Sequence, residues 1–311
     1  MIRNYDHYHS GRKRGIRARL LALVAGIAVL VAIAFIFRIP QRLLPSSDAR
    51  AGSGRIYDLF AGGRYDEVIS VADEALAADP QNAYVLAYRG FASFYRAVSE
   101  VNTENKTPYL DDAIVFMRKA KVAGTSMVGE TDYILAKSYY QKGKFYYDLA
   151  ISYMTRAIDG GYVQRDSYEV LGLSYRELGE PEKAMVCFLE ALKIEQTDIL
   201  LLTIGKTYLQ MKRTEDAVDY LLRTLNKTED KTVEKDARFC LGEIYLERSE
   251  LFKAEEQYLA LTRLDPRSAD AHLFLGDVYA KMNDRVKARA EWRIAFQINP
   301  EHYGAKLRLF K

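Results

Sequence analysis

The chain has 311 residues, of which 49% are hydrophobic and 28% charged, and it holds only 19 Gly and 7 Pro. These fractions are typical of a folded protein and exclude a collagen-like or low-complexity chain. The net charge is +3, but residues 1–55 hold ten Lys or Arg against two Asp or Glu, which leaves 35 against 40 in residues 56–311. The basic excess is therefore confined to the N-terminus, and we expect no nucleic acid among the partners.

The first predicted elements are a basic cytoplasmic tail, residues 1–19, and a transmembrane helix, residues 20–37. The run LLALVAGIAVLVAIAFIF contains eighteen uncharged residues. At ~1.5 Å per residue, such a helix nearly spans the ~30 Å hydrocarbon core of a bilayer. Basic residues are more frequent before the run than after it, which predicts a cytoplasmic N-terminus. The sequence therefore predicts a single-pass inner-membrane protein with the rest of the chain on the extracytoplasmic, periplasmic side.

A cleaved signal peptide is the alternative interpretation of this apolar run. Signal peptides usually have a shorter apolar region, about 7–15 residues. The Ala-Arg-Ala sequence at residues 49–51 lies far from the run, beyond two prolines. Whether the anchor is cleaved therefore stays open. Residues 38–54, with two Pro and a Gly-Ser-Gly sequence, are predicted to form a linker.

Most of the remaining chain follows a repeated pattern. It is clearest in VLGLSYRELGEPEKAMVCFLEALKIEQ (170–196), CLGEIYLERSELFKAEEQYLALTRLDP (240–266) and FLGDVYAKMNDRVKARAEWRIAFQINP (274–300). In each segment, Tyr stands three residues after the first Gly, Ala stands twelve after it, and an aromatic residue stands sixteen after it. This pattern resembles the tetratricopeptide repeat (TPR), a helix–turn–helix unit of about 34 residues.

The resemblance implies an all-α fold: an α-solenoid of about seven TPR-like helix–turn–helix repeats over residues 55–302, preceded by the transmembrane helix. Residues 303–311 are predicted to start a C-terminal capping helix, because a terminal repeat would otherwise expose its apolar face. In such repeats the Gly and Ala let two helices approach closely, and the aromatic residue fills the space between them. The repeat is less regular near residues 98–108, where we expect an insertion between two helices.

No feature of the sequence predicts an enzyme. The chain lacks a phosphate-binding loop, an H-E-x-x-H motif and a G-x-S-x-G motif. We therefore expect no catalytic residue, no metal site and no cofactor. The two cysteines, Cys187 and Cys240, stand more than one repeat apart, and are predicted to be free thiols rather than a disulfide.

The resemblance places the partner-binding residues on the first helix of each repeat, which lines the concave groove in this family and binds peptides or protein segments. In the second repeat, positions 84, 88, 91 and 95 are spaced as one aromatic face of a helix, and later repeats carry acidic residues there. The predicted groove residues are Tyr84, Tyr88, Phe91, Phe94, Tyr95, Tyr133, Tyr140, Glu169, Glu243 and Asp277. The rings could instead belong to the core, and the acidic side chains to a solvated surface.

The function predicted from these features is a membrane-anchored protein–protein interaction scaffold or assembly factor. Aromatic anchors usually carry much of the binding energy in protein interfaces, and the acidic positions favour a basic partner segment. The alternative is a chaperone-like holder of secreted or translocating client chains. The partner proteins and the oligomeric state are not determined by the sequence.

Overall fold

The structure, a computed structural model, describes residues 47–310, in which there are fifteen α-helices and no strand. The contacts between residues divide the chain into two units, one ending at Gly63 and the other beginning at Arg64. In the described part of the chain, the first unit contributes α2 (Ser47–Ala61). The helices of the second unit are α3 (Tyr65–Ala78), α4 (Ala83–Ser99), α5 (Thr103–Val122), α6 (Val128–Lys142), α7 (Tyr147–Asp159), α8 (Ser167–Glu177), α9 (Pro181–Ile194), α10 (Asp198–Gln210), α11 (Thr214–Lys227), α12 (Lys231–Glu247), α13 (Leu251–Leu264), α14 (Ala269–Lys281), α15 (Arg285–Ile298) and α16 (Tyr303–Phe310).

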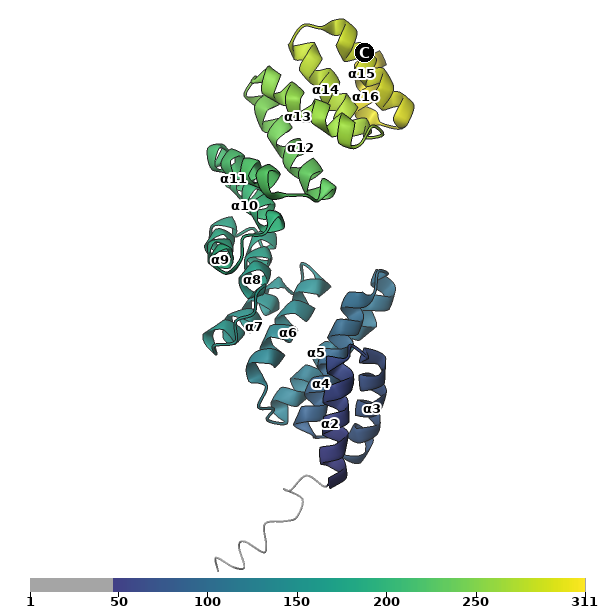
Figure 1. Cartoon of the computed structure of the whole chain (residues 1–311), viewed down its shortest axis with the longest axis vertical. Helices are drawn as coiled ribbons and strands as arrows, with labels where there is room; N and C mark the ends of the chain where they lie inside the picture. The colour runs from purple at the N-terminus through teal and green to yellow at the C-terminus, as the bar shows by residue number, and fades with distance from the viewer. Residues whose placement is uncertain (1–46, 311) are drawn as a thin grey trace, which may run out of the picture. The chain divides into compact units, whose positions relative to one another are not determined.

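The second unit is a stack of helix hairpins. From α4 to α15, each even-numbered helix packs most extensively against the helix that follows it, and each hairpin then packs on the next (Figure 1). The last helix, α16, packs on α15 in the place of a further first helix. The predicted all-α solenoid is therefore confirmed, since consecutive repeats bury their apolar faces against one another.

Small residues bring the two helices of each hairpin together, as predicted. A Cβ atom built on Gly172 would lie 2.6 Å from Cε1 of Phe188, and one on Gly242 would lie 2.7 Å from Cζ of Tyr258. Neither distance is compatible with a side chain larger than hydrogen. Phe188 and Tyr258 are both fully buried in the space that the glycines leave.

A recurring hydrogen-bond pattern ends the first helix of several repeats. The carbonyl oxygen of Tyr175 accepts from the backbone N–H of Glu180 at 2.9 Å, and that of Tyr245 accepts from Glu250 at 2.8 Å. This bond closes the turn only when the residue before the donor is left-handed. That residue is Gly179 (φ 80°) in the first case and Ser249 (φ 59°) in the second. The repeated tyrosine therefore marks the last turn of the first helix.

A buried arginine joins three helices near the start of the second unit. Arg89 of α4 is 7% exposed, and its guanidinium donates to Asp73 of α3 at 2.7 Å and to Asp112 of α5 at 3.1 Å. The same guanidinium lies over the ring of Phe116, 4.5 Å from its centroid. Two carboxylates and a ring face thus compensate the cost of burying the charge.

Two predicted connections turned out to be helical. The linker predicted for residues 38–54 is helical from Ser47 onward, where α2 begins. The insertion predicted at residues 98–108 is not a loop, because α4 continues to Ser99 and α5 begins at Thr103. Asn102 caps α5, since its side chain accepts from the backbone N–H of Glu104. The additional residues therefore lengthen the two helices of that repeat.

The predicted membrane localisation is not supported and must be corrected. Within residues 47–310, no helix combines the length and the apolar character that a membrane crossing requires. The predicted transmembrane helix, residues 20–37, and the basic tail, residues 1–19, lie outside the described residues. We therefore withdraw the prediction of a single-pass inner-membrane protein with a periplasmic array.

Candidate partner-binding face

The first helices of neighbouring repeats contact one another directly. Helix α6 contacts both α4 and α8, and α10 contacts α12. Among the described helices, no pair of second helices makes a comparable contact. We call the side of these helices that carries the predicted groove residues the first-helix face. It comprises Tyr84, Tyr88, Phe91, Phe94 and Tyr95 of α4, Tyr133 and Tyr140 of α6, Glu169 of α8, Glu243 of α12 and Asp277 of α14.

Most of the aromatic residues predicted on α4 are packed inside the molecule. Tyr88 is 9% exposed, Phe91 6% and Phe94 1%. Tyr95 is 36% exposed, and its ring stacks on Tyr65 of α3 with the centroids 5.3 Å apart. Whether these rings contact a partner stays a prediction. Their burial gives Tyr88, Phe91 and Phe94 a packing role in the free protein, whereas Tyr95 presents part of its ring to solvent.

Two further tyrosines of the face are half-buried. Tyr84 packs its ring against Tyr88, with the centroids 4.6 Å apart. Tyr140 packs against Tyr147 of α7 at 5.7 Å. Burial, and then the neighbouring Tyr147, raise the pKa of Tyr140, while Arg176 of α8 opposes the rise. Tyr140 therefore lies between α6 and α8 with part of its surface accessible.

A polar cluster links three consecutive first helices. The hydroxyl of Tyr133 donates to Oδ1 of Asp166 at 2.5 Å, and Nζ of Lys137 donates to Oδ2 of the same carboxylate at 2.6 Å. Lys137 also lies 5.0 Å from the ring centroid of Tyr133 and 5.7 Å from that of Phe94. Burial, and then the hydrogen bond to Asp166, raise the pKa of Tyr133. At neutral pH the phenol is thus a donor that orients Asp166 between α6 and α8.

Glu169 extends this cluster by one turn of α8. Its side chain is half-buried. Burial, and then the neighbouring Asp166, raise the pKa of Glu169, while Arg165 opposes the rise. A partly desolvated carboxylate beside another carboxylate is stabilised by an incoming positive charge. Glu169 is therefore suited to contact a basic group.

A second acidic site lies on α12 and α14. Glu243 is exposed, and partial burial of its carboxyl group, and then Glu247, raise its pKa. The buried ring of Tyr258 packs against Phe239 and Phe274, with the ring centroids 6.2 Å and 5.5 Å apart. The Tyr258 hydroxyl is buried and has no hydrogen-bond partner among the described residues. Burial, and then the nearby Glu243, raise the pKa of Tyr258.

Other acidic residues of these first helices already have partners within the chain. Asp277 is paired with Arg308 of α16, whose Nη2 lies 2.6 Å from Oδ2, and it accepts from Nε1 of Trp292 at 3.0 Å. Asp270 lies 2.9 Å from Nε2 of His302. The acidic surface that the sequence predicted over three repeats is therefore narrower, and is centred on Glu169 and Glu243.

Two lysines that were not among the predicted residues form ion pairs between neighbouring repeats. Lys137 and Lys206 occupy the same place in their repeats, and each pairs with an aspartate of the next first helix, Asp166 or Asp236, at 2.6 Å. In both pairs the Asp follows the Lys by 29 or 30 residues, close to one repeat length. This recurring spacing is the sequence pattern that could have predicted the ion pairs. Both pairs join neighbouring first helices.

The two cysteines are free thiols, as predicted. Cys187 of α9 is 8% exposed, and burial raises the pKa of its thiol to about 11. Burial also raises the pKa of the Cys240 thiol on α12, although Lys206 opposes the rise. Both thiols are thus protonated at neutral pH.

Comparisons with known proteins agree with this architecture. Two family models described as tetratricopeptide repeat match residues 166–198 and 241–301. No curated protein sequence matches the chain significantly. Among solved structures, the C-terminal part of a TPR repeat-containing protein from Cytophaga hutchinsonii is 16% identical with a TM-score of 0.66, and the match covers 83% of this chain and 99% of that one.

Two other solved structures are similar to parts of the chain. MamA from Desulfovibrio magneticus RS-1 is 17% identical with a TM-score of 0.50, covering 57% of this chain and 98% of that one. YrrB, a TPR protein with an unusual peptide-binding site, is 20% identical, covering 77% of this chain and 98% of that one, but its TM-score of 0.44 supports no inference. At these identities the likeness shows the fold alone. The matched family models show tetratricopeptide repeats in residues 166–198 and 241–301, and the hairpins of the second unit repeat the same fold.

Proposed function

We propose that this protein is an interaction scaffold that holds a segment of a partner protein along the first-helix face. Tetratricopeptide repeats imply protein–protein interaction, and proteins of this family are generally non-enzymatic scaffolds. The particular use of the first-helix face is our inference. It rests on the alignment of these helices, which contact one another from repeat to repeat.

The observation that carries the proposal is the site around Glu243. It combines an exposed carboxylate of raised pKa at Glu243, a second carboxylate at Glu247 and two partly buried rings, Phe239 and Phe274. A Lys or Arg side chain of a partner would pair with the two carboxylates. The site therefore fits a basic residue.

The other end of the face supplies aromatic anchors. Tyr84, Tyr95 and Tyr140 are partly exposed rings there, and Glu169 lies on the first helix that follows Tyr140. Tyrosine is frequent among the residues that dominate binding energy, because its ring adds area and its hydroxyl adds a hydrogen bond. A partner segment with apolar and basic residues would match this arrangement. We do not propose chaperone-like holding, because Phe91 and Phe94 are buried rather than part of a broad exposed apolar surface.

Site-specific photocrosslinking tests the proposal. We would introduce a photoreactive amino acid in the full chain in place of Tyr140 or Glu243, and in a control in place of Phe252 of α13, which is 83% exposed. One or two dominant partner proteins should crosslink from the two first-helix positions and not from Phe252. Crosslinking that is as strong from Phe252 as from Tyr140 and Glu243 would refute the proposal, as would crosslinking from neither first-helix position.

A charge-neutralising variant gives a second test. Replacing both carboxylates, Glu243→Gln with Glu247→Gln, should weaken recovery of the crosslinked partner by about tenfold, the effect of losing one charge-assisted contact. The matched control is Glu256→Gln on α13, an exposed second-helix carboxylate. Equal losses in the two variants would show that the effect is not specific to the face.

A further inference from the structure

Three adjoining depressions form a groove at the C-terminal end of the array. The largest, of about 750 Å³, runs between α14, α15 and α16 past Arg285, Arg289 and Arg293. The next, of about 420 Å³, shares Arg289 and Arg293 and continues to Phe296 and Phe310. The third, of about 370 Å³, shares these two rings. We call this surface the terminal groove. None of the predicted groove residues of the first-helix face lines it, although two of its lining residues, Trp292 and Arg308, hydrogen-bond Asp277 of that face.

One side of the terminal groove is a row of arginines. Arg285, Arg289 and Arg293 stand four residues apart on α15, a spacing that puts side chains on one face of a helix. All three are exposed, and none forms an ion pair with another described residue. The nearby Glu291 and Asp277 contact other side chains, since Glu291 hydrogen-bonds His272 and Asp277 pairs with Arg308. The row therefore carries a net positive charge.

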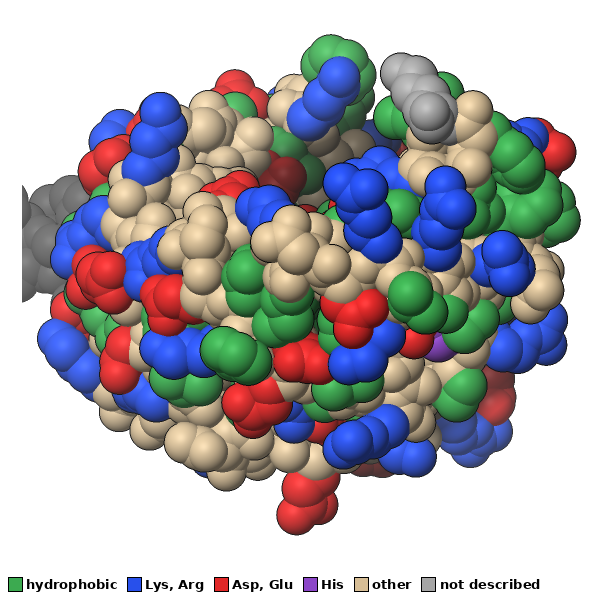
Figure 2. All heavy atoms as spheres, turned by 90° about the horizontal axis from the view of Figure 1, so that it is seen from above, with side chains coloured by type: hydrophobic (Ala, Val, Ile, Leu, Met, Phe, Trp, Pro, Cys, Tyr) green, Lys and Arg blue, Asp and Glu red, His purple; other side chains and the backbone are tan. Residues whose placement is uncertain are grey.

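The charge of this end differs from that of the rest of the array. Residues 281–311 hold eight Lys or Arg against three Asp or Glu, a net charge of +5. Residues 56–280 hold 27 against 37, a net charge of −10. Viewed towards this end of the second unit, Figure 2 shows Lys and Arg side chains gathered beside apolar ones. A local basic surface on an acidic array selects for a partner of opposite charge.

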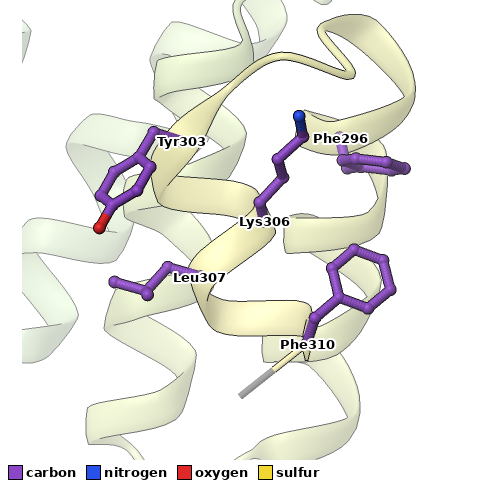
Figure 3. A pocket seen from close by; sticks show the side chains of 5 residues that line it. All are labelled: Phe296, Tyr303, Lys306, Leu307 and Phe310. Atoms are coloured by element: carbon purple, nitrogen blue, oxygen red, sulfur yellow. The ribbon is translucent and has the colours of Figure 1, made fainter.

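The other side of the groove is apolar. Phe296 of α15 and Phe310 of α16 meet edge to face, with the ring centroids 5.6 Å apart (Figure 3). Phe310 is 75% exposed, and at the opposite edge of this pocket Tyr303 is 77% exposed. Val286 is also 83% exposed at the arginine end. Large apolar side chains left open beside a charged row are typical of a protein-binding surface.

We propose that the terminal groove binds an acidic amphipathic segment of a partner protein. Carboxylates of the segment pair with Arg285, Arg289 and Arg293, and its apolar side chains pack on Phe296 and Phe310. Arginine suits this role because its planar group binds a carboxylate with two parallel bonds. The same end of the molecule already shows such a pair, in which Nε and Nη2 of Arg308 both donate to Asp277. A nucleic acid fits less well, since the remaining array would repel a long polyanion.

The test uses the full chain and a synthetic amphipathic peptide as the probe. The peptide carries glutamates four residues apart with a leucine beside each, and binding is measured by fluorescence anisotropy at near-physiological salt. The unmodified protein should bind it, and the charge reversals Arg289→Glu with Arg293→Glu should weaken binding by at least about tenfold. The control is Arg263→Glu on α13, an exposed arginine outside the groove, which should bind as the unmodified protein does.

A second variant separates the apolar contribution. Phe310→Ser should weaken binding of the leucine-containing peptide more than binding of a peptide in which serines replace the leucines. No binding, or equal binding by the charge-reversed and unmodified proteins, would overturn the proposal. Tighter binding of single-stranded DNA or of anionic lipid vesicles than of the peptide would also overturn it. Since no residue of the first-helix face is changed, crosslinking from Tyr140 should persist, which keeps this test distinct from that of the proposed function.

Discussion

At the residue scale, Gly172 is a position where a single added methyl group would clash with a buried ring. The fully buried ring of Phe188 lies across the place that its side chain would occupy. The same arrangement recurs at Gly242 with Tyr258 and at Gly276 with Trp292. Because the buried rings cannot move without opening a cavity, these contacts fix how closely the two helices of a repeat approach.

We expect Gly172→Ala to lower the free energy of unfolding by about 1–3 kcal/mol, the usual cost of overpacking a core. Urea denaturation followed by circular dichroism measures this change. The control is Gly54→Ala in α2, where no atom lies within 4 Å of the added Cβ. Adding Phe188→Leu should restore part of the loss, because the smaller side chain leaves room. Equal midpoints for Gly172→Ala and the unmodified protein would contradict this account of the repeat.

The reactivity of Cys187 should depend on pH in a manner set by burial. Its pKa is about 11 in the folded protein, against about 8.5 for an exposed thiol, and only the thiolate is alkylated. At about pH 8, iodoacetamide should therefore label Cys187 much more slowly in the folded than in the urea-unfolded protein. The folded rate should rise as the pH approaches the raised pKa. Mass spectrometry of tryptic peptides measures both rates, and equal rates would show that the thiol is not buried.

At the element scale, the turns after α8, α10, α12 and α14 share one conformation but use different residues. The left-handed position is Gly179 in one repeat, but Lys212 (φ 57°), Ser249 (φ 59°) and Asn283 (φ 64°) in others. A side chain at positive φ is strained, whereas Gly is not. Asn tolerates this conformation better than Lys or Ser, because its short polar side chain can hydrogen-bond locally.

Glycine at the strained turns should therefore stabilise the array. We predict that Lys212→Gly and Ser249→Gly each raise the free energy of unfolding by about 0.5–1 kcal/mol, after the greater flexibility of Gly in the unfolded chain is subtracted. Asn283→Gly should give a smaller gain. Thermal unfolding of the three variants measures how much each one stabilises the protein. A larger stabilisation by Asn283→Gly than by Lys212→Gly and Ser249→Gly would contradict the explanation.

The hairpins could be predicted from sequence because their signals are local. Three repeats show glycine, tyrosine, alanine and an aromatic residue at fixed spacing, which is enough to place two helices and their contact. The helix boundaries of the irregular repeats were harder to predict, because additional residues such as 98–108 can either extend helices or form a loop. Asn102 caps α5 with its side chain, and nothing in the repeat pattern indicates that outcome.

At the scale of the whole molecule, the candidate site depends on contacts between repeats, which the sequence does not show directly. Asp277 was predicted to face a partner, but Arg308, 31 residues later, already pairs with it. Tyr88 and Phe91 have the spacing of a groove-lining stripe and yet are buried. Exposure and pairing are set by how repeats stack, so the sequence could predict the face but not which of its side chains remain accessible.

The central claim is that a partner protein binds the first-helix face. Hydrogen–deuterium exchange on the complex recovered with the crosslinked partner tests it most directly. The first helices α6, α8 and α12 should exchange more slowly in the complex than in the free protein, with the second helices α7, α9 and α13 changing little. Protection confined to the second helices, or no protection in either set, would contradict the account.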